Sequence, residues 1–266
     1  MPRYRLLALD LDGTLISVDL KLDDRDVQAL ARARAAGMEP VAVTGRPFPG
    51  ALPWTRRLGL EGPLVCYQGA QVRSPKGEML LDHGVPHDLA MEVVRFCRER
   101  DLHVQAYRDD QLIVEQDRPE AHEYANHAGM QIHLVADLDQ AMSATTPKLV
   151  IVAEKEVVDR LLPEVRERWA GRLYAATSLP RYLEVTNPDA DKRQALEFLC
   201  GRLGVSREET VAVGDGRNDQ PMIEWAGLGY AVEGAPAEVV EAAGGRTVGK
   251  PGSGGVARLV DSLIQA

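Results

Sequence analysis

Two carboxylates stand two residues apart at the end of a short apolar run, Leu6–Leu9. They are Asp10 and Asp12, followed by Gly13 and Thr14, and the apolar run predicts a buried β-strand in front of them. Two like charges held this close in a buried place are costly unless a cation neutralises them or one side chain keeps its proton. A nucleophile and an acid that work beside a metal ion meet this condition, so we interpret the pair as candidate catalytic residues.

Three further groups of polar residues end predicted strands or open predicted helices. They are Thr44-Gly45-Arg46, Lys192, and Asp215 with Asn218 and Asp219. Each group alone also fits an ordinary turn, a helix cap or a solvated surface. The carboxyl ends of neighbouring parallel strands face one crevice, so groups distant in sequence can converge there. Taken in this order, the four groups predict one site.

The elements that would carry these groups alternate between strand and helix at both ends of the chain. This alternation favours a parallel sheet with right-handed crossovers. A turn pattern around Ser74-Pro75-Lys76-Gly77 adds a predicted hairpin. The elements expected here are strands over 6–9, 40–43, 64–67 and 210–213 and helices over 24–36, 49–58, 192–203 and 256–264.

The middle of the chain has a different pattern, with several strands and three helices that suggest a second sheet. The strands are expected over 103–108, 112–115, 131–135, 148–153, 173–177 and 182–186, and the helices over 87–100, 119–128 and 156–169. The predicted fold is therefore an α/β, doubly wound parallel Rossmann-like core over residues 1–83 and 187–266, interrupted by an α+β cap domain over residues 84–186.

Composition and charge narrow the class of protein. Of the 266 residues 45% are hydrophobic and 27% charged, as in an ordinary globular protein. A net charge of −9 would repel nucleic acid and anionic membrane surfaces, so neither is expected as a partner. The cysteines Cys66, Cys97 and Cys200 are odd in number and far apart, which favours a reducing cytoplasm. We expect no signal peptide or membrane anchor, and the sequence leaves the oligomeric state open.

The four polar groups, in their order, resemble the four motifs of the haloacid dehalogenase superfamily of aspartyl-phosphate enzymes. The insertion of about 100 residues between Thr44 and Lys192 resembles that of the Cof-type phosphatases, which carry a large α/β cap. The resemblance extends over essentially the whole chain. It implies Mg²⁺-dependent hydrolysis of a phosphate monoester of a small metabolite, with the cap selecting the substrate.

The resemblance also implies a role for each matching residue. Asp10 would be the nucleophile, and Asp12 would protonate the leaving alcohol and then activate water. The metal site would be formed by Asp10, Asp215 and the backbone carbonyl of Asp12. The remaining matches are phosphate-binding Thr44, Gly45 and Lys192, and Asn218 and Asp219 in support of the metal's waters and of Lys192.

The chain departs from the pattern of the family at several positions near the expected crevice. Gln68 stands where asparagine is usual, Glu233-Gly234-Ala235 stands where Gly-Asn-Ala is usual, and Asp191 and Arg193 replace smaller residues beside Lys192. The first two departures bear on the residues that support the catalytic groups and on how the leaving group is recognised. None of the changes removes a primary catalytic group.

Three activities remain open at this point. Besides a phosphatase, the same residues fit a phosphotransferase or mutase that passes the phosphoryl group to an alcohol, and a phospho-ligand-binding protein without turnover. A sugar phosphate is the leading substrate, followed by phosphorylated cofactors such as flavin mononucleotide or pyridoxal phosphate. Arg46 fits either a substrate contact or a salt bridge.

Overall fold

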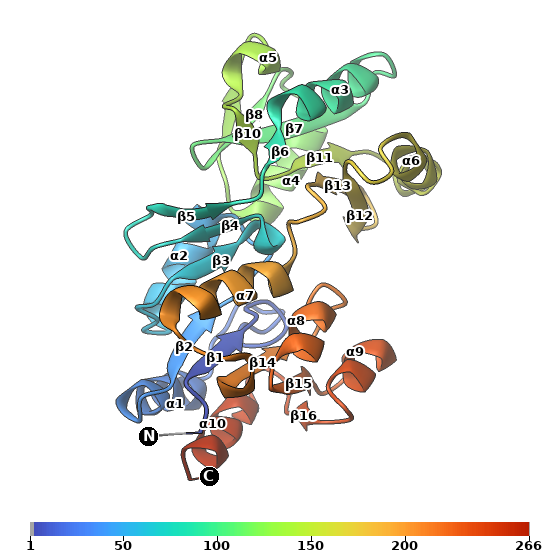
Figure 1. The fold of residues 1–266 in the computed structure, drawn as a ribbon. Coiled ribbons are helices and arrows are strands. Elements are labelled where there is room, and N and C mark those ends of the chain that lie inside the picture. Colours follow the sequence, from blue (N-terminus) through green and yellow to red (C-terminus); the bar gives the residue numbers. More distant parts are fainter. Residues whose placement is uncertain (1–2, 266) are drawn as a thin grey trace. The chain divides into compact units, whose positions relative to one another are not determined.

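The computed structural model describes residues 3–265, whose contacts divide them into two units (Figure 1). The core unit is formed by the described residues up to 81 and from 191 onward, and the cap unit by residues 82–190. The sequence placed these two boundaries after residues 83 and 186. No helix among residues 3–265 combines the length and the apolar character needed to cross a membrane.

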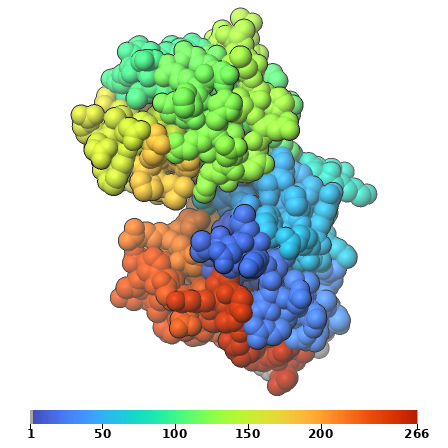
Figure 2. All heavy atoms as spheres, turned by 180° about the vertical axis from the view of Figure 1, so that it is seen from behind, coloured from blue at the N-terminus to red at the C-terminus, as the bar shows by residue number. Residues whose placement is uncertain are grey.

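A parallel sheet organises the core, with the strand that precedes Asp10 in its centre. Its order is β16-β15-β14-β1-β2, and β1 pairs with β14 from Leu6 opposite Thr210 to Leu9 opposite Val213. The first and last parts of the chain therefore lie side by side, blue against orange and red in Figure 2. The strands are β1 (Leu6–Leu9), β2 (Glu39–Ala42), β14 (Thr210–Gly214), β15 (Leu228–Val232) and β16 (Thr247–Val248).

Helices cover both faces of this sheet. Side chains alternate along a strand, so Leu6 and Ala8 share one face, where they pack with apolar residues of α7 and α8. Leu7 and Leu9 point to the other face and are equally buried. This confirms the doubly wound α/β class. The helices of the core are α1 (Asp24–Ala35), α2 (Phe48–Arg57), α7 (Lys192–Leu203), α8 (Gln220–Trp225), α9 (Ala237–Ala242) and α10 (Gly255–Gln265), with short 3₁₀ helices η1 (Tyr67–Gly69) and η2 (Arg207–Glu209).

The start of α7 is fixed by a side-chain cap. Asp191 accepts a hydrogen bond from the backbone N–H of Gln194 at 2.9 Å, which satisfies a donor that the helix itself leaves unpaired. The helix ends at Gly204, whose φ of 63° is left-handed. The cap therefore sets Lys192 at the first position of the helix, and the observed range is the one predicted from the sequence.

The strand over Leu64–Cys66 departs from the expected parallel sheet. This strand, β3, forms a separate sheet with β4 (Gln71–Arg73) and β5 (Met79–Asp82) and pairs antiparallel with β4. Its pairing beside the end of β2 is limited to an isolated parallel bridge between Val43 and Val65. The reason is the tight turn η1, which sends the chain straight back along β3. The predicted hairpin is confirmed, because Ser74 N–H donates to the Glu78 carbonyl at 2.9 Å between β4 and β5.

The cap unit has its own mixed sheet, in the order β12-β13-β11-β7-β8-β9. Apolar side chains of α3 and α6 form a hydrophobic cluster with alternate residues of this sheet. A buried ion pair also lies in the unit, where Lys148 Nζ donates to Glu184 Oε1 at 2.8 Å. Its elements are β6 (Val85–Pro86), α3 (His87–Arg98), β7 (His103–Arg108), β8 (Gln111–Val114), α4 (Pro119–Ala128), β9 (Ile132–Leu134), α5 (Leu138–Ala141), β10 (Thr145–Thr146), β11 (Leu149–Val152), α6 (Lys155–Arg168), β12 (Tyr174–Leu179) and β13 (Tyr182–Thr186).

Candidate active site

Asp10 lies directly after the central strand β1 and is almost completely buried, with 5% of its surface exposed. Its backbone N–H donates to the Val213 carbonyl at 3.0 Å, which fixes it at the carboxyl edge of the sheet. Lys192 Nζ donates to Oδ1 of Asp10 at 2.6 Å. The second oxygen, Oδ2, accepts no hydrogen bond from the described residues. Asp10 is therefore held by one oxygen and offers the other.

Among the described residues, Lys192 is the only cation hydrogen-bonded to the carboxylate of Asp10, and it also binds Asp219. Its Nζ donates to Asp219 Oδ1 at 2.5 Å, and the lysine is 1% exposed. Burial by itself would lower the pKa of Lys192, but the adjacent charges of Asp10 and Asp219 raise it above its usual value. Lys192 is thus a fixed positive charge between two carboxylates.

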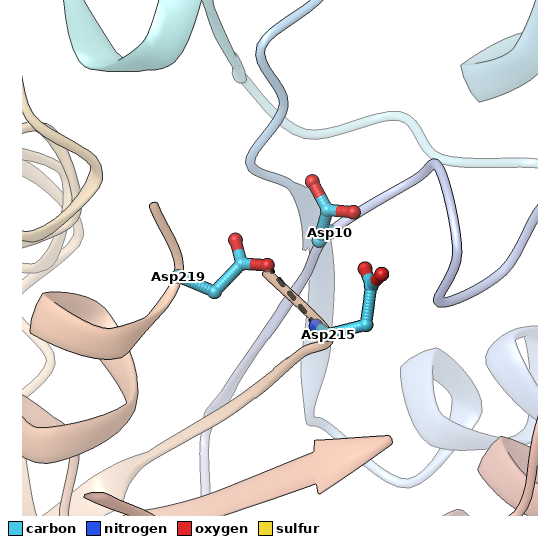
Figure 3. Close-up of side chains that lie close together, drawn as sticks. All are labelled: Asp10, Asp215 and Asp219. Atoms are coloured by element: carbon cyan, nitrogen blue, oxygen red, sulfur yellow. Dashed lines mark hydrogen bonds between the residues drawn. The ribbon is translucent and has the colours of Figure 1, made fainter. Parts of the chain in front are cut away.

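Asp215 and Asp219 come from the segment after β14, and both carboxylates turn toward Asp10 (Figure 3). Asp219 Oδ2 accepts the backbone N–H of Asp215 at 3.0 Å, drawn as the dashed line, and that of Gly216 at 2.9 Å. Since its other oxygen binds Lys192, both carboxylate oxygens of Asp219 have partners, and Asp219 fixes the loop after β14. Of the supporting role that the resemblance implied for Asp219, the structure shows the contact with Lys192.

Thr14 and Gly13 bring Asp215 into place, a contribution that the sequence did not reveal. Thr14 Oγ1 donates to Asp215 Oδ1 at 3.2 Å. Gly13 has a φ of 82°, and a Cβ there would overlap the carboxylate of Asp215. The pairing joins residues about 200 positions apart and depends on the register between β1 and β14, which explains why no local signal predicted it.

The three carboxylates form a group with oxygen ligand atoms within 4.8 Å of one another. Burial raises the pKa of Asp10 well above its usual value in spite of Lys192, and Asp219 and Asp215 raise it further. Burial, followed by the charge of Asp219, raises the pKa of Asp215 to about 6. The site thus holds more negative charge than Lys192 balances. An oxygen-only donor set with excess negative charge fits a hard divalent cation such as Mg²⁺.

The side chain of Asp12 lies outside this group and is half exposed. Both its oxygens accept hydrogen bonds from Arg46, at 2.6 Å from Nε and 2.5 Å from Nη2. Of the two roles left open for Arg46, the structure shows the salt bridge. A bidentate guanidinium fixes the orientation of a carboxylate as well as its position, so Arg46 orients the candidate acid.

Thr44 and Gly45 follow the end of β2, as predicted. Thr44 is 1% exposed, and its Oγ1 accepts the backbone N–H of Arg46 at 3.1 Å. An oxygen that accepts in this way keeps its own O–H proton for another partner. The hydroxyl of Thr44 is therefore available as a donor next to Gly45, as a phosphate-binding role requires.

The last residue assigned from the sequence, Asn218, reaches an unexpected partner. Its Nδ2 donates to Oε1 of Gln68 at 2.8 Å. Gln68 lies in η1, and the sequence singled it out only as a departure from the family pattern. The structure thus places all eight assigned residues in the core unit. Hydrogen bonds to one another or to Arg46 and Gln68 join seven of them, namely Asp10, Asp12, Thr44, Lys192, Asp215, Asn218 and Asp219.

Comparison with known proteins gives a consistent result. A family model described as haloacid dehalogenase-like hydrolase matches residues 7–260. A protein of Serratia proteamaculans named HMP-PP phosphatase is 28% identical over 229 residues, which cover 86% of this chain and 84% of that protein. A haloacid dehalogenase-like hydrolase from Bacteroides thetaiotaomicron superposes with a TM-score of 0.89 at 27% identity, covering 98% and 99% of the two chains. A Thermotoga maritima protein superposes equally well, with a TM-score of 0.89 at 29% identity and 97% coverage of both chains.

Proposed function

The chain belongs to the haloacid dehalogenase-like hydrolases, and from that premise we propose that it hydrolyses phosphate monoesters of small metabolites through a covalent intermediate on Asp10. The family, the fold class and the enzyme class, a phosphatase, were predicted from the sequence and are confirmed by these comparisons. The observation that carries the mechanism is the state of Asp10, with one oxygen held by Lys192 and the other oxygen without a donor.

In the first step, Asp10 Oδ2 attacks the phosphorus atom of the ester. The bond from phosphorus to the ester oxygen breaks, and Asp12 gives a proton to the departing alcohol. Lys192 and the Thr44 hydroxyl donate to the phosphoryl oxygens, whose charge is redistributed as the group is transferred. The products of this step are the alcohol and a phosphoryl group bound to Asp10.

In the second step, water replaces Asp10 on the phosphorus atom. Asp12, ionised after the first step, takes a proton from the attacking water. The bond between phosphorus and Asp10 Oδ2 breaks, which frees inorganic phosphate and restores the carboxylate. Arg46 supports the second step, because it holds the ionised Asp12 in one orientation through two hydrogen bonds.

Asp10 and Asp215, with the backbone carbonyl of Asp12, are the groups we assign to Mg²⁺. When bound, the cation supplies positive charge for the carboxylates and the phosphoryl oxygens. The raised pKa of Asp215 supports this assignment, because burial and the charge of Asp219 outweigh the nearby charge of Lys192, and no cation among the described residues is hydrogen-bonded to this carboxylate.

We further propose that cap residues 84–186 select the substrate, with a sugar phosphate or similar metabolite as the first candidate. The similar Serratia protein is named HMP-PP phosphatase, which supports a small phosphorylated substrate. A phosphotransferase would use the same Asp10 intermediate and differ only in the acceptor of the second step.

The decisive experiment is phosphate release from a panel of phosphorylated metabolites, measured with Mg²⁺ and with a chelator. We expect metal-dependent release from a few compounds and none with Asp10→Asn, which keeps the shape of the side chain but loses its nucleophile. Asp261→Asn, a change at an exposed carboxylate on α10, is the matched control and should behave like the wild type. Full turnover by Asp10→Asn would refute the mechanism. Transfer to an added alcohol in place of water would favour the phosphotransferase.

A further inference from the structure

The turn η1 holds three successive residues in the left-handed region of backbone conformation. The φ angles of Tyr67, Gln68 and Gly69 are 52°, 62° and 100°. Glycine adopts such angles freely, whereas tyrosine and glutamine do so at a cost in free energy. Strain of this kind persists where the surrounding structure enforces it, and it gathers at functional sites.

The turn is enforced by two segments of the candidate phosphate site. Tyr67 N–H donates to the Arg46 carbonyl at 2.9 Å, and Gln68 N–H donates to the Thr44 carbonyl at 3.1 Å. On its other side, a Cβ at Gly69 would overlap the carbonyl of Asp191, the residue that caps α7. The turn is therefore packed between the loop that contains Thr44 and the start of α7, which contains Lys192.

The side chain of Gln68 is directed by this arrangement. Its Oε1 accepts the hydrogen bond from Asn218 Nδ2 at 2.8 Å. The amide nitrogen, Nε2, lies over Gly45, so closely that a Cβ on Gly45 would overlap it. Nε2 finds no acceptor among residues 3–265. One end of the planar amide is thus anchored, and the other presents N–H donors at Gly45.

We propose that Gln68 Nε2 donates a hydrogen bond to a non-bridging oxygen of the bound phosphoryl group, alongside Thr44 and Lys192. This inference rests on the proposed phosphatase function and adds a phosphate contact to it. A neutral donor suits this place, because an additional cation would compete with the metal for Asp10 and Asp215. The length of glutamine is also needed, because the amide must reach Asn218 and Gly45 at the same time.

The sharpest test is Gln68→Glu, which is nearly identical in shape. The variant keeps an acceptor for Asn218 but presents a carboxylate oxygen where Nε2 presented its hydrogens. We expect kcat/KM to fall by about tenfold or more, the usual value of a hydrogen bond to a charged group. The fall should be the same for every ester that the wild type hydrolyses. Gln28→Glu makes the same change of charge at an exposed position on α1 and should leave kcat/KM unchanged.

Inhibition by inorganic phosphate separates a phosphoryl contact from a leaving-group contact, since inorganic phosphate has no alcohol portion. Gln68→Glu should raise the inhibition constant of phosphate by a factor similar to its loss of kcat/KM. Losses that differ among esters, with unchanged inhibition by phosphate, would place the amide at the leaving group and overturn the inference. So would wild-type kinetics in the variant.

A second variant, Gly45→Ala, tests the same contact without altering Gln68. The new methyl group would displace the amide, so Gly45→Ala and Gln68→Ala should each weaken phosphate inhibition, and the double variant should lose little more than either. Additive losses would show that Gln68 does not act at Gly45. If the wild type hydrolyses no ester, the proposed function fails. The contact can then still be tested by comparing how strongly inorganic phosphate protects the wild type and Gln68→Glu from thermal unfolding.

Discussion

Replacing Asp215 with asparagine should stabilise the metal-free protein and remove its response to Mg²⁺. In the folded protein the pKa of Asp215 rises from 3.8 to about 6, because of burial and then because of Asp219. A raised pKa means that the folded state binds the proton more tightly than the unfolded state does. Stability is therefore lost as the pH rises from about 4 to about 6. Asparagine cannot ionise, and its oxygen can still accept the hydrogen bond from Thr14.

The size of the effect follows from the shift in pKa. One unit of pKa corresponds to about 1.4 kcal/mol, so the shift of Asp215 would correspond to about 3 kcal/mol in the free energy of unfolding if the side chain were fully buried. Asp215 is only partly buried, so solvent screening reduces this to about 1–2 kcal/mol. Asp215→Asn should accordingly exceed the wild type in free energy of unfolding by that amount above pH 6, with the gain shrinking toward pH 4.

Urea unfolding in a chelator at several pH values measures this gain, and repetition with Mg²⁺ tests the metal site. A ligand at a hundred times its dissociation constant stabilises a folded protein by about 2.7 kcal/mol. The wild type should gain stability of this order, and Asp215→Asn should gain much less. A variant with the same pH profile and the same response to Mg²⁺ as the wild type would refute both the charge argument and the metal assignment.

Three other changes test separate parts of the structure. Asp12→Ala should slow both the formation and the hydrolysis of the phosphorylated enzyme, as followed by rapid quenching, and normal rates would remove Asp12 from proton transfer. Lys192→Met leaves two buried carboxylates without their cation and should cost about 3–5 kcal/mol of stability in urea unfolding; an unchanged midpoint would contradict that loss. In the cap, Lys148→Met should lower the free energy of unfolding by a similar amount, because it leaves Glu184 buried without its partner. The double variant Lys148→Met with Glu184→Leu should be nearly neutral, and equal losses for the single and double variants would speak against a buried pair.

The spacing of apolar residues and the residues that typically begin or end an element predicted the long helices and strands well, because these signals are local in the sequence. The helix over Lys192–Leu203 follows from apolar spacing with a capping aspartate before it and a glycine after it, and its limits agree with the structure. Short elements such as α5 (Leu138–Ala141) were missed, since four residues hold too little periodic signal. The strand β3 was identified, but its antiparallel partner depends on the left-handed turn at Tyr67 and Gln68, which neither residue type predicts.

The residues of the site could be predicted, because the carboxyl ends of strands in a parallel sheet converge. The hydrogen bonds between these residues could not be predicted. Arg46 meets Asp12 only because β1 and β2 are adjacent and in register. The link between Gln68 and Asn218 spans 150 residues and requires both a strained turn and the loop after β14. Such contacts follow from the assembled sheet, for which the sequence offers no local marker.

The position of β1 has a consequence for synthesis on the ribosome. This strand, buried on both faces in the finished core, pairs with β14, which begins at Thr210. At about 5–20 residues per second, roughly 10–40 s separate the synthesis of the two strands. During that interval the nascent chain displays an apolar strand with one edge unpaired, while the contiguous cap unit can already form. Newly made chains are therefore most exposed to misassociation late in translation, and binding of a chaperone to this segment would have the greatest effect then.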